Sequence, residues 1–522
     1  MIREISRRKC LRLWMCKPEY MGRTKWENRF VLLRFRKKNY MMFLKDLKRF
    51  KMERLYDKLK AYSESDFYAF HMPGHKRNKA LLGIELPYDL DITEIDGFDD
   101  LHHADGILKE EQERAARVFG AEESHFLVNG STAGILSAVM GCTHRGDKIL
   151  VARHCHKSIY HAIYMNGLVP RYVYPEFDIS MHMNGEISKE DVAKALAAEP
   201  DIKAVVIVSP NYDGVVSDVK GIAEVAHSYR IPLIVDEAHG PHFGFHPAFP
   251  GRANDLGADV VINSLHKTLP SLTQTAILHI NGKFANRRRI KKYLDMLQSS
   301  SPSYIFMASL DACVDFLDGK CEEAFELYVE RLQKFREELE PLQHLQILRT
   351  EHYDISKVVI STANANITSP ELADRLRKEY HLEMEMTGGT YVLAMTTVAD
   401  TQEGLDRLKA ALLEIDGQLE AKTAVSGSIE ISGELPRLEQ YFTPQEAADR
   451  EEDGEAEEIP WKESEGYISL EYAYLYPPGS PVIVPGERIS REAVELLCYY
   501  ETQNLQIEGI QTEGKIKVWK HE

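Results

Sequence analysis

The chain has 522 residues and a formal net charge of −17 at pH 7, with 44% hydrophobic and 28% charged residues. This composition is typical of a globular protein with two to four domains. The acidic balance argues against nucleic acid as a partner, because a phosphate backbone binds basic surfaces. No apolar run is long enough to span a bilayer, so we also expect no membrane partner.

The first fifty residues differ in charge from the rest, with sixteen Lys and Arg against four Asp and Glu. They lack the continuous apolar run and small-residue cleavage site of a secretory signal. We interpret residues 1–51 as an appended basic extension, with the working protein beginning near Met52; a basic arm for a membrane surface or nucleic acid is the alternative. The seven cysteines form no CxxC pair, which favours a reducing, cytoplasmic location.

From about residue 105 the pattern alternates between helix and strand, which predicts a mostly parallel sheet with helices on both faces. About seven strands are expected by residue 280. Their sequences are HFLVNG, KILVA, PRYVYP, KAVVIVSP, IPLIVDEAHG, DVVINS and QTAILHI.

Three further regions follow this sheet. The stretch FELYVERLQKFREELEPL predicts a linking helix, and the segments from KVVIST to EGLDRLKAALLEI predict a smaller α/β domain. We therefore expect a major domain over 52–324, a small domain over 325–420 and a C-terminal domain over 421–522. The acidic run at 443–460 is expected to be a solvated linker within the last of these.

Polar residues stand where predicted strands end. Asp236 ends an apolar strand, Lys267 follows the next strand, His156 follows KILVA, and Ser131 and Thr132 open the helix after HFLVNG. Open α/β sheets bind ligands at the carboxyl ends of their strands, and a helix N-terminus with hydroxyl groups suits a phosphate. Alone, each residue has an ordinary structural explanation, as a helix cap or a solvated charge.

Together these residues match the needs of pyridoxal 5′-phosphate (PLP). This cofactor requires an amine for a Schiff base, a carboxylate for its ring nitrogen, a phosphate cup and a flat group on the ring face. His239, His242 and His246 have a spacing that could suggest a metal site, but no HExxH motif is present, and we expect no metal.

The sequence resembles the Orn/Lys/Arg decarboxylase family of fold-type-I PLP enzymes, in particular the shorter bacterial form without an N-terminal wing domain. The resemblance covers about residues 53–510. The motifs that carry it are FHMPGHKRN (70–78), DDLHHADG (99–106), VNGSTAG (128–134), RHCHKS (153–158), VDEAHG (235–240), SLHKTLPSLTQ (264–274), SSSPSY (299–304) and YPPGSPVIVPGE (476–487).

The resemblance implies an aspartate-aminotransferase-like fold and a set of site residues. Lys267 would form the Schiff base, Asp236 would pair with the ring nitrogen, and His156 would stack on the ring, with Ala238 on its opposite face. The phosphate would be bound or flanked by Ser131, Thr132, Ser264 and His266, and by Ser300 and Ser301 acting on the phosphate of the partner subunit. The role of His239 stays open, and Asn211 and Tyr212 are candidates for the PLP 3-oxygen.

The implied reaction is α-decarboxylation of a basic amino acid to agmatine or a diamine in polyamine biosynthesis, by a homodimer or larger oligomer. Arginine is slightly favoured as substrate over lysine or ornithine, and Lys267 or His266 would protonate the α-carbon. Asp99, Asp100 and Glu487 are candidate contacts for the distal cation of the substrate. Another fold-type-I enzyme, such as an aminotransferase or aldolase, and a catalytically silent regulator are the alternatives.

Overall fold

The computed structural model describes residues 54–81, 83–178, 183–421, 434–475, 479–502, 505 and 507–520. The basic segment 1–51 and the expected start near Met52 lie outside the described residues. The fold below is that of the unit that begins at Arg54.

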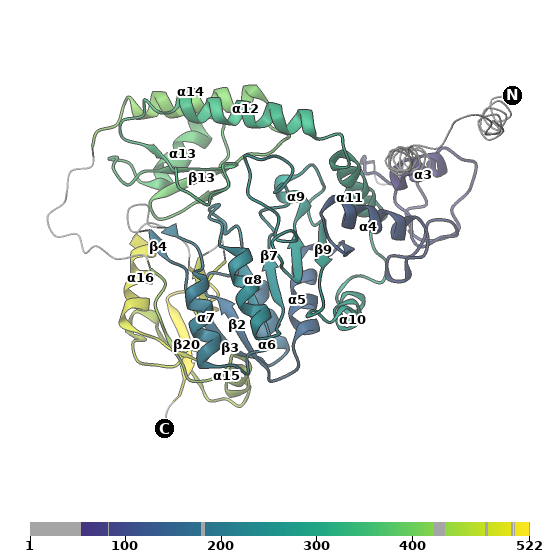
Figure 1. Cartoon of the computed structure of the whole chain (residues 1–522). Coiled ribbons are helices and arrows are strands. Elements are labelled where there is room, and N and C mark those ends of the chain that lie inside the picture. The colour runs from purple at the N-terminus through teal and green to yellow at the C-terminus, as the bar shows by residue number, and fades with distance from the viewer. Residues whose placement is uncertain are drawn as a thin grey trace, which may run out of the picture. The chain divides into compact units, whose positions relative to one another are not determined.

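A seven-stranded sheet forms the centre of the molecule (Figure 1), as the sequence predicts. Its strand order is β1-β9-β8-β7-β6-β2-β3. The pairs among β2, β3, β6, β7 and β8 are parallel, whereas β9 is antiparallel to both of its neighbours. The strands are β1 (Glu123–Leu127), β2 (Lys148–Ala152), β3 (Val169–Val173), β6 (Val205–Val208), β7 (Leu233–Asp236), β8 (Val260–Asn263) and β9 (Ala276–Ile280).

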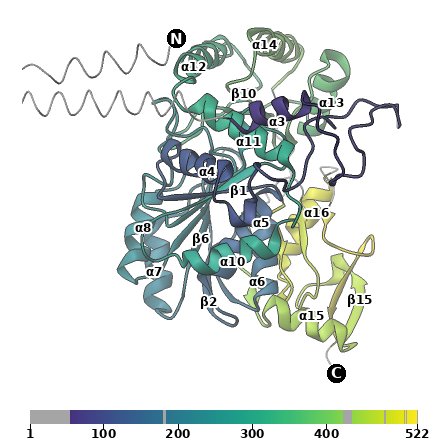
Figure 2. The same ribbon diagram turned by 90° about the vertical axis from the view of Figure 1, so that its right-hand side faces the viewer.

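Helices cover both faces of this sheet, which is why its central strands are apolar on both sides. All four residues of β6, β7 and β8 are buried. One group of helices packs against one face and a second pair lies on the other side (Figure 2). The first group is α5 (Gly130–Cys142), α6 (Lys157–Met165) and α10 (Arg287–Leu297); the second is α7 (Lys189–Ala198) and α8 (Val219–Ser228).

The small domain is an antiparallel sheet with helices, in the order β10-β11-β13-β12. Two long helices, each with a buried apolar face, connect it to the main sheet, and one apolar core runs through both regions. The boundary predicted at 324/325 falls inside α12. The elements are α11 (Tyr304–Leu317), α12 (Glu322–Glu338), β10 (Gln346–Ile347), β11 (Lys357–Ser361), α13 (Ser369–Tyr380), β12 (Met386–Thr387), β13 (Tyr391–Met395) and α14 (Gln402–Asp416).

The C-terminal region has its own apolar core, which includes Trp461, Ile483, Leu496 and Ile516. Its elements are β14 (Glu439–Gln440), α15 (Pro444–Glu452), β15 (Ala456–Pro460), β16 (Ala473–Leu475), β17 (Pro481–Ile483), β18 (Glu487–Arg488), α16 (Arg491–Thr502), β19 (Ile507–Glu508) and β20 (Lys515–Trp519).

The expectation of a solvated linker at 443–460 is wrong. Thr443 and Glu446 form a reciprocal capping box that starts α15, and a capping box stabilises a helix even where the sequence is highly charged. The strand β15 then pairs along its whole length with β20. The acidic residues therefore belong to the exposed faces of ordered elements.

The N-terminal part of the described chain leads into the sheet through α3 (Leu55–Ser63), a short 3₁₀ helix, η1 (Leu101–His103), and α4 (Ile107–Val118). Within the described ranges, no helix has the length and apolar character needed to cross a bilayer.

Candidate active site

Lys267 lies in a four-residue helix, α9 (Leu265–Thr268), that directly follows β8. Its Nζ is 2.8 Å from Nε2 of His239. Burial lowers the pKa of Lys267, and the charge of Lys357 acts in the same direction, while Asp236 and Glu385 oppose the shift. A lysine amine with a depressed pKa is a better nucleophile near neutral pH.

Asp236 is the last residue of β7 and is buried. Its Oδ1 accepts the N–H of Ala238 at 3.1 Å, and among the described residues no side chain donates a hydrogen bond to it. Burial raises the pKa of Asp236, and Lys267 opposes this. A buried carboxylate is stabilised when a bound group places a cationic N–H beside it. The protonated ring nitrogen of PLP provides such an N–H.

His156 caps the N-terminus of α6. Its Nδ1 accepts the N–H of Ser158 at 3.2 Å and lies 2.9 Å from the hydroxyl of the same residue. Burial lowers the pKa of His156 to about 4, with further contributions from Lys267 and Lys157. The ring is therefore neutral at pH 7 and fixed in orientation, as stacking on a flat cofactor requires.

Ser131 and Ser264 are joined by a hydrogen bond between their hydroxyl groups. This bond connects the first turn of α5 to the end of β8. Gly130, which starts α5, has φ +71°, a conformation that favours glycine. Thr132 is exposed on the same turn. Hydroxyl groups beside the free N–H groups of a helix N-terminus fit a phosphate.

The remaining predicted residues are placed less directly. Nδ1 of His266 lies 2.9 Å from the carbonyl of Thr275, and Ala238 is buried between Asp236 and His239. Ser300 and Ser301 are exposed, and Ser301 exchanges two hydrogen bonds with Ser299, its N–H donating to the hydroxyl and its carbonyl accepting from it. Their action on the phosphate of a partner subunit stays a prediction.

His239 is the functional candidate whose role the sequence left open. It is buried, and burial together with Lys267 and Lys357 holds its pKa well below the usual range. A neutral ring that accepts from Lys267 at Nε2 carries its proton on Nδ1. That Nδ1 is buried and has no hydrogen-bond partner in the described part of the chain. Its N–H is therefore available to donate a hydrogen bond to an acceptor atom of a bound group.

Tyr212 and Glu385 extend this arrangement. The ring of Tyr212 lies 4.5 Å from that of His239, centroid to centroid, and its hydroxyl donates a hydrogen bond to the carboxylate of Glu385. Glu385 is exposed and belongs to the small domain. By contrast, the amide of Asn211 is engaged with the backbone of Asn184, Gly214 and Val215.

The three acids proposed for the distal end of the substrate are engaged elsewhere. Asp99 accepts N–H groups at the start of α4, including those of Gly106 and Leu108 at 2.9 Å each. Asp100 caps η1. Glu487 is fully buried and forms a bidentate ion pair with Arg153 at 2.8 and 2.9 Å. These contacts assign structural roles to all three carboxylates.

The histidines with metal-like spacing also have other partners. His242 lies 3.0 Å from the hydroxyl of Thr268 and 3.1 Å from Asp354, while His246 lies 3.1 Å from Glu326. Across the described ranges, no group of three His, Cys, Asp or Glu side chains is arranged to hold a metal ion.

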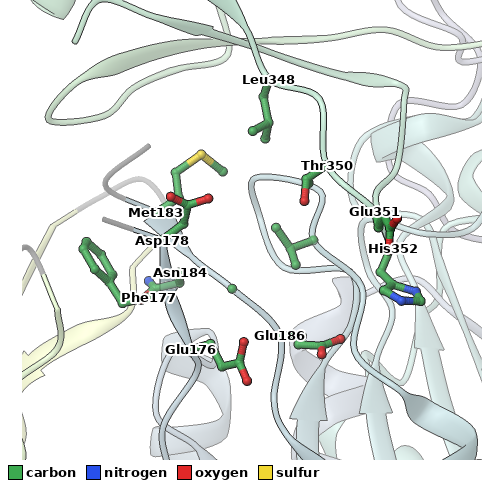
Figure 3. Close-up of a pocket in the computed structure, with 12 residues that line it drawn as sticks. Glu176, Phe177, Asp178, Met183, Asn184, Glu186, Leu348, Thr350, Glu351 and His352 are labelled. Atoms are coloured by element: carbon green, nitrogen blue, oxygen red, sulfur yellow. The ribbon is translucent and has the colours of Figure 1, made fainter. Parts of the chain in front are cut away.

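A cavity of about 350 Å³ lies between the hairpin of β4 (Phe177–Asp178) and β5 (Met183–Asn184) and the segment before β11. Figure 3 shows Leu348 on one side of it and the carboxylates of Glu176 and Glu186 on the other. None of its lining residues is one of the predicted cofactor residues.

Comparisons with known proteins point to one enzyme family. The profile of the Orn/Lys/Arg decarboxylase major domain matches residues 53–422, and that of the C-terminal domain of the same family matches 433–514. The arginine decarboxylase of Bacillus subtilis is 33% identical over 471 residues, which cover 87% of this chain and 95% of that protein. The lysine decarboxylase LdcA of Pseudomonas aeruginosa is 25% identical over 552 residues, covering 83% and 73%.

The solved structures show the same fold. The crystal structure of the lysine decarboxylase of Francisella novicida superposes with a TM-score of 0.76 at 20% identity, covering 92% of this chain and 84% of that one. Both domains of one family are matched in order, and the matches together span most of the chain. The chain therefore belongs to the Orn/Lys/Arg decarboxylase family.

Proposed function

We propose that this protein is a PLP-dependent decarboxylase of a basic amino acid, with arginine as the favoured substrate and agmatine and carbon dioxide as products. The observation that carries the proposal is the placement of Lys267, Asp236, His156 and the Ser131–Ser264 pair at the carboxyl ends of β8, β7, β2 and β1 in one sheet. The product would enter polyamine biosynthesis, and the enzyme would act in the cytoplasm.

The residues around Lys267 fit PLP. Lys267 would hold the aldehyde carbon covalently, Asp236 would hold a proton on the ring nitrogen, and His156 and Ala238 would cover the two ring faces. The first turn of α5 with Ser131, and Ser264 opposite, would hold the phosphate. Bound PLP withdraws electrons from the α-carbon of an attached amino acid, so that its carboxylate can leave as carbon dioxide.

Proton transfer in this site would depend on Lys267 and His239. With substrate bound, the amine of Lys267 would be free to carry a proton to the α-carbon. Nε2 of His239, 2.8 Å from Nζ, accepts a hydrogen bond from Lys267 and so orients that amine. This contact supports Lys267, backed by His239, as the group that protonates the α-carbon. His266, bonded to the carbonyl of Thr275, stays the second candidate.

The carboxylate of Glu385 is the group in this structure best suited to the distal cation of the substrate. It is held by the hydroxyl of Tyr212, whose ring lies against His239 beside Lys267. A carboxylate can bind a guanidinium through two parallel hydrogen bonds, which an ammonium cannot match. The higher identity to an arginine decarboxylase than to a lysine decarboxylase also favours arginine.

A substrate panel tests the proposal. The purified holoenzyme is incubated separately with arginine, lysine and ornithine, and carbon dioxide and amine products are quantified. We expect carbon dioxide and agmatine from arginine in equal amounts, with slower turnover of the other two. Release of a keto acid without carbon dioxide would identify an aminotransferase, and no turnover of any amino acid by a PLP-loaded protein would identify a silent regulator.

We further propose that the protein is a homodimer or a larger homo-oligomer. The segment 67–72 exposes Phe67, Tyr68, Phe70 and Met72, and Phe70 has 89% of its surface accessible. Adjacent exposed aromatic residues of this kind mark interaction surfaces. A second copy of the chain that covers them would remove this apolar area from water. Light scattering coupled to size-exclusion chromatography should give at least twice the monomer mass.

A further inference from the structure

The helix α9, which carries Lys267, is a single helical turn. Its backbone hydrogen bonds include those from the N–H of Lys267 to Ser264 at 3.2 Å and from the N–H of Leu269 to Leu265 at 2.9 Å. One turn of helix is not stable by itself, because fixing its backbone costs more than these few bonds return. The orientation of Lys267 therefore depends on the side-chain contacts that hold this turn.

Two histidines from the loop after β7 contact consecutive residues of α9. Nε2 of His239 lies 2.8 Å from Nζ of Lys267, and Nδ1 of His242 lies 3.0 Å from Oγ1 of Thr268. These are the first two histidines of the group whose spacing could suggest a metal site. In the structure one ring contacts the lysine amine and the other contacts the hydroxyl group of the next residue.

The ring of His242 is held by polar and aromatic contacts. Its Nε2 lies 3.1 Å from Oδ1 of Asp354, so both ring nitrogens are engaged. The rings of Phe243 and Phe249 meet the imidazole edge to face, at centroid distances of 4.9 and 4.8 Å. His242, Thr268 and Asp354 are all buried, so their hydrogen bonds are shielded from water.

Asp354, in the segment just before β11, is also fixed. The N–H and the hydroxyl of Ser356 donate to it at 3.0 and 2.8 Å, and its own N–H donates to the carbonyl of Gly214 at 2.9 Å. Burial would raise the pKa of Asp354, but His242 and Lys357 outweigh burial and hold that pKa below the usual range. A neutral imidazole that donates its Nε2–H to this carboxylate accepts the hydroxyl hydrogen of Thr268 at Nδ1.

We propose that His242 is a positioning residue for Lys267: held by Asp354 of the small domain, it fixes the turn of α9 through Thr268 and so directs the lysine amine. The role rests on the proposed function, because the amine needs a fixed direction only if it reacts with the aldehyde of PLP. A displacement of about 1 Å between reacting groups can lower a rate by about a hundredfold. The contact with His242 is therefore expected to matter more for reaction than for binding.

The formation of the covalent bond provides the measurement. Nζ of the neutral lysine attacks the aldehyde carbon, a C=N bond forms, and the two amine hydrogens leave with the aldehyde oxygen as one water. Full-length protein freed of PLP is mixed with excess PLP in a stopped-flow spectrometer, and the visible absorbance of the Schiff base gives its rate of formation. Thr268→Val removes the hydroxyl at nearly constant shape, and we expect the rate to fall about tenfold, the effect of one lost hydrogen bond.

Matched variants identify the hydroxyl and the ring as the cause. Thr268→Ser keeps the hydroxyl and should react at the wild-type rate. His242→Phe should slow the reaction, and the double variant His242→Phe, Thr268→Val should be no slower than His242→Phe, because both changes break the same bond. His246→Phe is the control, since His246 lies in the same loop but contacts Glu326. If His242→Phe does not fold, the two Thr268 variants decide the test.

A purely structural role for His242 would give another pattern. In proteins that also carry Lys267→Ala, PLP binds without a covalent bond, and Thr268→Val should leave its dissociation constant in equilibrium dialysis unchanged. Urea denaturation of the PLP-free proteins measures their stability separately. An unchanged rate of Schiff-base formation in folded Thr268→Val would overturn the proposal, as would a rate that falls only in proportion to the affinity for PLP.

A failure of the proposed function is distinguishable from a failure of this inference. The covalent step needs no amino acid, so the rates report the effect of His242 even if the holoenzyme decarboxylates no basic amino acid. Conversely, normal decarboxylation with an unchanged rate in Thr268→Val overturns only the role of His242. If the wild-type protein forms no Schiff base at Lys267, both proposals fall before any variant is compared.

Discussion

Asp236 is the single residue whose charge matters most to the proposed chemistry, because it would keep the ring nitrogen of the cofactor protonated. Asp236→Asn preserves the size of the side chain and its contact with the N–H of Ala238 but removes the charge. We expect kcat to fall by about a hundredfold or more, as for loss of a preorganised electrostatic contact. Steady-state kinetics at saturating PLP measure this, and a fall of less than threefold would contradict the assignment.

Glu385 should affect substrate binding more than chemistry, since it would contact the distal end of the substrate. Glu385→Gln keeps a hydrogen-bond acceptor for Tyr212 but loses the charge. We expect KM for arginine to rise about 10- to 100-fold, the range for a hydrogen bond to a charged group, with kcat changed much less. Glu383→Gln, an exposed neighbour, serves as the control. An unchanged KM would place the guanidinium elsewhere.

Among the helices, α5 and α10 are packed so closely that they require a glycine. A Cβ on Gly141 would lie 2.8 Å from Cα and 2.9 Å from the backbone nitrogen of Ile290. Because backbone atoms cannot move aside, Gly141→Ala should lower the free energy of unfolding by about 1–3 kcal/mol. A Cβ on Gly404 in α14 would meet only the hydroxyl of Thr401, at an ordinary contact distance of 3.9 Å, so Gly404→Ala should be neutral or slightly stabilising. Urea denaturation of both variants checks this.

The ion pair of Arg153 and Glu487 connects β2 to the C-terminal region beside the turn that carries His156. Glu487→Gln would leave a buried guanidinium without its counter-ion, and we expect a loss of about 3–5 kcal/mol in the free energy of unfolding. The double variant Arg153→Met, Glu487→Met removes both charges and should recover most of that loss. If the single variant is as stable as wild type, the pair does not hold the two regions together.

For the whole molecule, stability should depend on pH through Glu111 of α4, whose partner Arg114 also bonds Asp311 of α11. Burial raises the pKa of Glu111 to about 9, with Asp311 adding to the shift and Arg114 opposing it. In the unfolded chain this carboxyl titrates near its usual value of about 4.3. The folded state therefore binds an extra proton between these values, and stability should fall as pH rises toward 9.

Glu111→Gln tests this dependence, because glutamine keeps the shape of the protonated acid without titrating. We expect the variant to show a flatter decline in the free energy of unfolding between about pH 5 and pH 9 than wild type. Chemical denaturation at several pH values gives the comparison. Parallel curves for the two proteins would mean that Glu111 is ionised in the folded state.

The sequence alone was sufficient to predict the main sheet and the residues at its strand ends. Buried parallel strands have continuous apolar runs, and their carboxyl ends must share one edge, so the sequence predicts that Asp236, Lys267 and His156 lie near one another. At 443–460 the density of acidic residues favours a linker, whereas the capping box of Thr443 and Glu446, a local signal in the same stretch, predicts the helix that the structure has.

Only the tertiary structure decided the contacts that cross between domains. Glu385 and Asp354 are far from Lys267 in the chain, and no local pattern predicts which residues of the small domain approach the main sheet. The sequence makes Glu487 a candidate substrate contact, and only the fold shows that it is buried in an ion pair with Arg153. Short stretches of sequence are enough to predict the periodicity of a helix or strand and the residue at which a strand ends. The environment of a charged side chain depends instead on the packing of distant segments. That environment determines the pKa of the side chain and its function.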